Sequence, residues 1–346
     1  MKWKIERDRK VYDVGDGYMY RHSVVIDPST GRNIWMTKSI TEEVLKTIRR
    51  EYVPRKSDVF LCTYIKSGTT WVQAILRELI DLKEGTDTRV EGISVGLTEG
   101  ERIPWIEQMA GIVGVKKWIE TLNAMPSTRR RIFKTHCTCG IVRSWMTKGS
   151  KMIFVVRDPR DVVVSAWHHT RTKNFKYEGP FQHFANEMFL KGRIECGDWF
   201  LYTKECMKAA AADREHVLVL RYEAMLRNPI DAVKTIASFL EIELPDSSAV
   251  ARIVRNTSFD AMKRAEKKGG LRVPGWPHRK LEGAESPGTE AVPSKCHIRR
   301  GGGGKWRKYL TEECAREFSV RYTKHIGGSI DDIAAESSDT SDEKGS

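Results

Sequence analysis

The feature that most constrains the fold is a series of short, unbroken apolar runs that begins after Asp58. These runs read VFLCTY, RIFKT, MIFVV and HVLVLRY, and segments with helical apolar spacing such as TTWVQAILRELIDL follow along the chain. Strands that are apolar at every position are buried on both faces, which is typical of a parallel sheet covered by helices. The sequence therefore predicts an α/β fold, a single domain with a central parallel sheet flanked by helices.

The segments on either side of this pattern have a different character. Residues 1–56 hold a possible hairpin around the turn at 28–31 and a helix from Ser39 to Tyr52 capped by Thr41, so we expect them to pack on the core domain at 57–326. Residues 267–298 are rich in Gly and Pro and are predicted to form a long loop. Residues 327–346 are acidic and rich in Ser, which predicts a disordered tail.

The charge of the chain favours an anionic ligand. Lys and Arg number 59 against 46 Asp and Glu, a net charge of +13. The last 16 residues carry six acids and one lysine, so the rest of the chain is near +18. A basic nucleic-acid-binding protein is one alternative, but the dispersed charge and the absence of zinc-finger spacing or aromatic RNA-binding motifs favour a small polyanion.

The cysteines and the N-terminus bear on the compartment. Seven cysteines lack paired metal spacing, since Cys137-x-Cys139 is the only close pair, and this predicts reduced thiols and no metal site. The first residues, MKWKIERDRK, contain no apolar core of a signal peptide, and no apolar run reaches 18 residues. We therefore predict a cytoplasmic protein without membrane association.

The stretch TYIKSGTTW, at 63–71, follows the first apolar strand and opens a helix. Backbone N–H groups, the helix dipole, hydroxyl groups and Lys66 would all attract an oxyanion there. A P-loop of an NTPase has the pattern G-x-x-x-x-G-K-[ST], whereas Lys66 precedes Gly68 here. A phosphate-like site without the usual magnesium arrangement is predicted, and a nucleotide kinase or NTPase remains the alternative.

Three further basic segments accompany this turn. Arg157 lies at the carboxyl end of the MIFVV strand, before an Asp-Pro helix start. Lys134 and His136 follow the RIF run and would point the same way along a strand. The segment HIRRGGGGKW places arginines before four glycines. Ligands of α/β sheets bind at the carboxyl ends of strands, so we expect these segments to converge.

Together these segments resemble the cytosolic sulfotransferases. The family motifs TYPKSGTTW, R-N-P-K-D-V-x-V-S, K-T-H and R-K-G-x-x-G-D-W-K correspond, in order, to TYIKSGTTW, RDPRDVVVS, Lys134 to His136 and RRGGGGKWR. RYEAML and NTSFDAMK match smaller elements. The resemblance implies a P-loop-NTPase-like sulfotransferase fold at 57–326 and transfer of a sulfuryl group from 3′-phosphoadenosine 5′-phosphosulfate (PAPS), releasing 3′-phosphoadenosine 5′-phosphate (PAP), to a hydroxyl or amine of a small-molecule acceptor, without a metal.

The resemblance also implies roles for individual residues. His136 would be the general base, and Lys66, Lys134 and Ser165 would complete the catalytic set. The 5′-phosphosulfate would be held by Lys66, Ser67, Gly68, Thr69 and Thr70, and the 3′-phosphate by Arg157, Ser165, Arg299, Arg300 and Gly301. The adenine would lie near Trp71, Tyr222, Thr257 and Phe259. Trp105 and Ile106, with His136, are candidate walls of the acceptor site, and 267–298 is a candidate acceptor-covering lid.

Several departures from the family pattern affect these expectations. Ile65 replaces a proline before Lys66, and Asp158 replaces an asparagine beside Arg157. The spaced K-T-V-E dimer motif of the family reads Arg307, Thr311, Glu312 and Arg316. The usual dimer is therefore not expected, and a monomer or a different dimer is predicted.

Overall fold

The computed structural model describes residues 3–6, 9–27, 29–85, 103–171, 177–267 and 301–335. The predicted loop at 267–298 lies outside these ranges except for Lys267. Arg299 and Arg300, predicted to bind the 3′-phosphate, also lie outside them.

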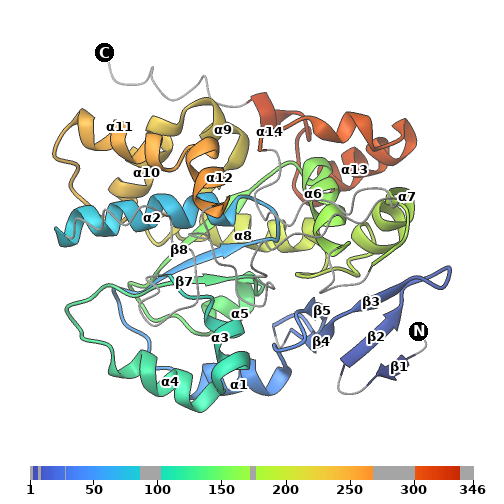
Figure 1. Cartoon of the computed structure of the whole chain (residues 1–346), viewed down its shortest axis with the longest axis horizontal. Coiled ribbons are helices and arrows are strands. Elements are labelled where there is room, and N and C mark those ends of the chain that lie inside the picture. Colours follow the sequence, from blue (N-terminus) through green and yellow to red (C-terminus); the bar gives the residue numbers. More distant parts are fainter. Residues whose placement is uncertain are drawn as a thin grey trace.

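A four-stranded parallel sheet forms the centre of the molecule (Figure 1). Its strands lie in the order β7 (Ile132–Thr135), β6 (Val59–Thr63), β8 (Lys151–Val156) and β9 (Val217–Arg221). Each pair of neighbours is parallel. The four apolar runs therefore form the predicted strands, and the α/β fold with a central parallel sheet is confirmed.

The two faces of the sheet belong to different hydrophobic clusters. Leu61 and Ile153 pack with apolar residues of α2 (Thr69–Glu84), α10 (Pro229–Phe239) and α11 (Ser247–Asn256). Phe60 and Phe154, their neighbours along the strands, belong to the cluster on the other face. Successive side chains of a strand point to opposite faces, so continuous apolar runs are what a sheet covered on both sides requires.

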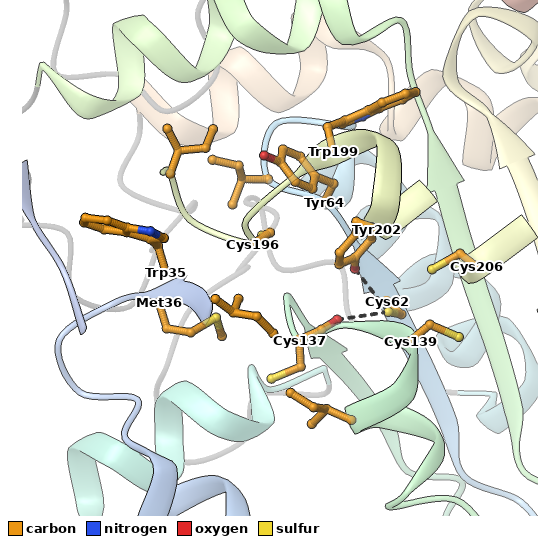
Figure 2. Packing of buried hydrophobic residues seen from close by; sticks show 14 of the residues in the cluster. Trp35, Met36, Cys62, Tyr64, Cys137, Cys139, Cys196, Trp199, Tyr202 and Cys206 are labelled. Carbon is orange, nitrogen blue, oxygen red and sulfur yellow. Dashed lines mark hydrogen bonds between the residues drawn. The ribbon is translucent and has the colours of Figure 1, made fainter. Parts of the chain in front are cut away.

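Figure 2 shows part of this second cluster, which we call the main core, where buried thiols pack among aromatic rings. It is covered by α5 (Cys139–Arg143) and α8 (Trp199–Ala212). Cys62 Sγ lies 3.2 Å from the Tyr202 hydroxyl and donates to the carbonyl of Cys137 at 3.4 Å. The six cysteines of the described ranges are buried free thiols.

The N-terminal segment contributes two small antiparallel sheets and a helix. β1 (Trp3–Glu6), β2 (Arg9–Asp13) and β3 (Met19–Arg21) form one sheet, which the sequence pattern did not predict. β4 (Ser23–Ile26) and β5 (Asn33–Met36) form the predicted hairpin. In the predicted helix, α1 (Glu42–Glu51), Thr41 accepts a bond from the N–H of Val44. Trp35 and Met36 are buried in the main core.

The remaining elements surround the sheet and its carboxyl end. They are α3 (Ile106–Val113), α4 (Val115–Ala124), α6 (Pro159–Thr170), α7 (Phe181–His183), the π-helix η1 (Phe184–Phe189), α9 (Tyr222–Arg227), α12 (Phe259–Lys267), the 3₁₀-helix η2 (Lys305–Lys308) and α13 (Glu312–His325). As predicted, Asp158 caps α6 by accepting from the N–H of Arg160 at 2.9 Å. Among the described residues, no helix has the length and apolar character needed to cross a membrane.

The prediction of a disordered tail from residue 327 is wrong for residues 327–335. These residues lead into the short helix α14 (Asp332–Ala335), and Ile330 and Ile333 are buried. The Asp331 carboxylate accepts from Arg160 at 2.7 Å. The acidic composition of this segment predicted disorder. The segment is ordered because Ile330 and Ile333 are buried against other parts of the chain and because Asp331 pairs with the distant Arg160.

Candidate functional site

The site lies where the four parallel strands end. Lys66 follows β6, His136 follows β7, Arg157 follows β8 and Tyr222 follows β9. Neighbouring strands run in the same direction, so these ends share one edge of the sheet. The order of the strands therefore brings the predicted segments together, although they are far apart in the chain.

The turn after β6 is shaped by backbone conformation. Gly68 has a φ of 105°, and a Cβ atom added to it would lie 2.7 Å from the Tyr222 ring. Gly68 is also the N-cap of α2 and provides no side chain to cap the helix. The Ser67 hydroxyl is buried and has no hydrogen-bond partner among the described residues. Thr69 and Thr70 begin α2 just after this turn. A helix N-terminus beside an unsatisfied buried hydroxyl is suited to an oxyanion.

Arg157 connects this turn to the glycine-rich segment at 301–304. Its Nη1 donates to the carbonyl of Lys66 at 2.9 Å, and its Nη2 donates to the carbonyl of Gly302 at 3.0 Å. Its guanidinium carbon lies 4.3 Å from the centre of the Tyr222 ring. The Nε atom is buried and has no partner among the described residues. The arginine thus holds two backbone segments together and keeps one N–H available.

Asp161, in the first turn of α6, fixes the other end of the glycine-rich segment. Its Oδ2 accepts from the N–H of Gly304 at 2.5 Å, and its Oδ1 accepts from Lys305 and Trp306 at 2.8 Å and 3.2 Å. Asp161 is 3% exposed. This role could not be predicted from the sequence, because an acid in the first turn of a helix is already explained by its favourable interaction with the helix dipole.

Three of the residues predicted near the adenine lie beside these loops. The Trp71 and Tyr222 rings meet edge to face, with 5.7 Å between centroids. A Cβ added to Gly301, which has a φ of 54°, would lie 2.7 Å from the Phe259 ring, so this backbone approaches the ring closely. The fourth, Thr257, is buried at the end of α11 and donates to the carbonyl of Ile253. Ser165 is half-buried on α6.

His136 is held in a defined orientation. Its Nδ1 lies 2.7 Å from the carbonyl oxygen of Thr63, which only accepts hydrogen bonds, so Nδ1 carries the proton and Nε2 carries the lone pair. The N–H of His136 donates to the Glu107 carboxylate at 2.8 Å. Burial, together with the charges of Lys134 and Lys66, holds the pKa of His136 well below its usual value. The imidazole is therefore kept neutral, as a general base requires.

Trp105 contacts both Lys134 and His136. The Lys134 ammonium lies 4.0 Å from the centre of the Trp105 ring, and the His136 ring meets this ring edge to face at 4.8 Å. Ile106 is completely buried in the main core, and its carbonyl accepts from Trp118 Nε1. Both residues belong to this buried core, and of the two Trp105 contacts Lys134 and His136.

Three titratable residues near these side chains were not found from the sequence. Burial raises the pKa of Glu107, and it raises the pKa of Glu195 to about 7. Burial and the charges of Lys66 and Lys134 lower the pKa of His169 well below its usual value. None of the three belongs to a recognisable pattern, and only the fold brings them near the lysines.

The comparisons with known proteins agree on one family. A model of the sulfotransferase domain matches residues 56–329. Sulfotransferase 1B1 of the dog is 30% identical over 283 residues, which cover 80% of this chain and 86% of that protein. The 3-beta-hydroxysteroid sulfotransferase of Cavia porcellus is 25% identical, with 83% of this chain and 89% of that protein covered. In fold, the chain is similar to mouse sulfotransferase SULT7A1, solved in complex with PAP. The TM-score is 0.64 at 24% identity, over 89% of this chain and 98% of that one.

Proposed function

Because the chain belongs to the sulfotransferase domain family, we propose that it transfers a sulfuryl group from PAPS to a small-molecule acceptor, with His136 as the general base. Family membership removes the kinase or NTPase alternative and the nucleic-acid-binding alternative. The observation that carries the proposal is the neutral, oriented imidazole of His136 beside Lys134 and Lys66, next to a turn suited to an oxyanion.

The donor side fits a nucleotide with two anionic ends. We assign the 5′-phosphosulfate to the turn from Lys66 to Thr70, where the Ser67 hydroxyl is buried without a partner. We assign the 3′-phosphate to Arg157, whose Nε likewise has no hydrogen-bond partner among the described residues. Ser165, Gly301, Arg299 and Arg300 would complete this site, although the two arginines lie outside the described residues. PAPS supplies a sulfuryl group that is already activated by its bond to phosphate.

The reaction needs one proton acceptor and stabilisation of one leaving group. The acceptor oxygen or nitrogen attacks sulfur, its proton passes to Nε2 of His136, and the bond between sulfur and the phosphate oxygen breaks. The electron pair of that bond stays on the departing phosphate, where the ammonium groups of Lys66 and Lys134 stabilise the charge. The Thr63 carbonyl stabilises the imidazolium that forms, because it accepts a hydrogen bond from the Nδ1–H group both before and after the proton transfer.

We also propose that the protein is cytoplasmic and does not use the usual family dimer. The first proposal rests on the six buried thiols and the second on the altered dimer motif. Of that motif, Thr311 caps α13 by accepting from the N–H of Cys314, so it has a local structural role in the chain. Light scattering of the purified protein measures the oligomeric state.

A binding and turnover experiment tests the proposed function. Purified protein is titrated with PAP, then incubated with PAPS and a mixed library of phenols, alcohols, steroids and amines, and products are detected by the added mass of a sulfo group. We expect micromolar or tighter binding of PAP, weaker binding of the analogue without the 3′-phosphate, and at least one sulfated product. No PAP binding and no product would overturn the proposal.

A further inference from the structure

Trp105 is an aromatic residue beside the reacting groups to which the proposed reaction gives no role. It is 7% exposed, and the Lys134 ammonium lies 4.0 Å from the centre of its ring. The His136 ring meets the same indole edge to face, with 4.8 Å between centroids and an interplanar angle of 86°. One side chain therefore contacts both the proposed base and a lysine assigned to the leaving phosphate.

The backbone around Trp105 fixes where its indole lies. Trp105 bridges in parallel to Lys134, on the edge strand β7, and the N–H of Lys134 donates to the carbonyl of Pro104 at 2.9 Å. Just after Trp105, the Glu107 carboxylate accepts from the N–H of His136 at 2.8 Å. These bonds lie on both sides of Trp105 in the chain, so the indole is held in register with the two reacting side chains.

The face of an indole suits the buried ammonium of Lys134. Lys134 is 8% exposed, and an ammonium group that leaves water needs compensation for its lost hydration. The electron-rich face of an aromatic ring attracts a cation within about 6 Å of its centre, and the indole of Trp does so most strongly. This attraction acts on the charge, so N–H groups of the ammonium can still donate to oxygens of the leaving phosphate.

We propose that Trp105 is a positioning residue for sulfuryl transfer, whose indole face holds the Lys134 ammonium beside His136 and the departing phosphate. The inference rests on the proposed function and adds a residue to the same site. Trp105 exchanges no proton and no bond, and it acts through Lys134. The rate should therefore depend on the electron density of the ring, and this dependence should vanish when the ammonium is removed.

Fluorinated tryptophans at position 105 test this dependence. Each added fluorine withdraws electron density from the face of the indole, while the ring keeps nearly the same shape. Site-specific replacement of Trp105 by mono-, di- and trifluorinated tryptophan should lower kcat/KM in steps, to about a tenth for the most fluorinated ring. In the Lys134→Met background the same series should change kcat/KM by less than about twofold, because no ammonium faces the ring.

Conventional substitutions give a second measurement. Trp105→Phe keeps a weaker aromatic face and should retain about a third of the wild-type kcat/KM, whereas Trp105→Leu should lose about tenfold. Burial, and next the charge of Lys134, lowers the pKa of His136. An ammonium that the ring no longer holds lowers this pKa less, so the acid limb of kcat/KM should move to higher pH in Trp105→Leu.

Trp118→Leu is the matched control. Trp118 lies in the same core, and its Nε1 donates to the carbonyl of Ile106, the neighbour of Trp105, at 3.1 Å. This variant also removes a buried indole, so it should lower the free energy of unfolding, but it should leave the acid limb in place. A limb that moves equally in both leucine variants would mean that Trp105 acts only by packing, and the inference would fail.

The fluorinated series also separates this inference from the proposed function. A series without effect in the wild-type background, or an equal fall in the Lys134→Met background, would overturn the inference. If the protein binds PAP and forms sulfated products whatever the fluorination of the ring, only the inference fails. If the protein neither binds PAP nor forms any product, the proposed function fails.

Discussion

The donor side and the acceptor side of the site are built in different ways. On the donor side, side chains hold backbone: Arg157 donates to two carbonyls, and Asp161 accepts from three backbone N–H groups. On the acceptor side, the Trp105 ring contacts Lys134 and His136, and Trp105 comes from a segment that matches no family motif. A nucleotide bound through turns demands particular glycines and charges in sequence, whereas an acceptor bound by individual side chains leaves the rest of the chain free to vary.

His136 stands between the two sides, and its removal should have the largest effect. In His136→Ala we expect turnover to fall by about 10²–10⁴-fold, since a positioned base contributes that much. PAP affinity should change by less than about threefold, because the imidazole contacts Thr63 and Trp105 rather than the donor loops. Steady-state kinetics and calorimetry measure the two quantities. His216→Ala, at a distant turn beside Asp213, is the control. Near-normal turnover of His136→Ala would contradict its role.

Arg157→Ala tests whether Arg157 binds the 3′-phosphate of the donor. We expect PAP to bind about 10–100-fold more weakly, because charge-assisted hydrogen bonds are lost. The analogue that lacks the 3′-phosphate should lose much less affinity. Titrations with both nucleotides supply the comparison. Equal losses would mean that Arg157 acts only by joining the carbonyls of Lys66 and Gly302.

Asp161→Asn tests whether positioning of the glycine-rich segment matters for the donor. An asparagine retains one acceptor oxygen for the N–H groups of Lys305 and Trp306, but it points an NH₂ group at the N–H of Gly304. We expect PAP affinity to fall by about tenfold, which one unsatisfied buried N–H accounts for. KM for PAPS should rise while kcat changes little. A fall in kcat alone would place Asp161 in the chemical step instead.

The pH profile of kcat/KM tests whether the charge of Lys134 lowers the pKa of His136. The pKa of His136 is lowered by burial, and next by the charge of Lys134. The neutral imidazole is the active form, so activity is lost as pH falls through this pKa. Lys134→Met removes a positive charge that lowers the pKa, and the acid limb of kcat/KM should therefore move to higher pH, whatever the loss of rate. Lys191→Met, at an exposed ion pair with Glu187, should leave the limb in place. A limb that stays or moves to lower pH in Lys134→Met would argue against this coupling.

The two sides also differ in how far the sequence predicted them. The strand ends that carry Lys66, His136 and Arg157 were readable because continuous apolar runs define parallel strands, and parallel strands align their carboxyl ends. Arg157 was expected to face an anion, but its bonds to the carbonyls of Lys66 and Gly302 depend on how two loops meet. The raised pKa of Glu195 was not predicted, since it comes chiefly from burial, which only the fold creates.

The smallest effect is expected at the outer limit of the donor side. Asp331 follows the buried Ile330 and reaches Arg160, whose guanidinium lies 4.2 Å from the centre of the Trp306 ring. The side chain of Asp331 is 73% exposed, and exposed ion pairs contribute about 0–1 kcal/mol. Asp331→Asn should therefore lower the free energy of unfolding by no more than about 1 kcal/mol and leave PAP affinity unchanged. Urea unfolding and PAP titration measure both. A tenfold loss of PAP affinity would mean that the C-terminal segment belongs to the donor side, because the ion pair would then be fixing Arg160 and Trp306 beside the loop that Asp161 holds.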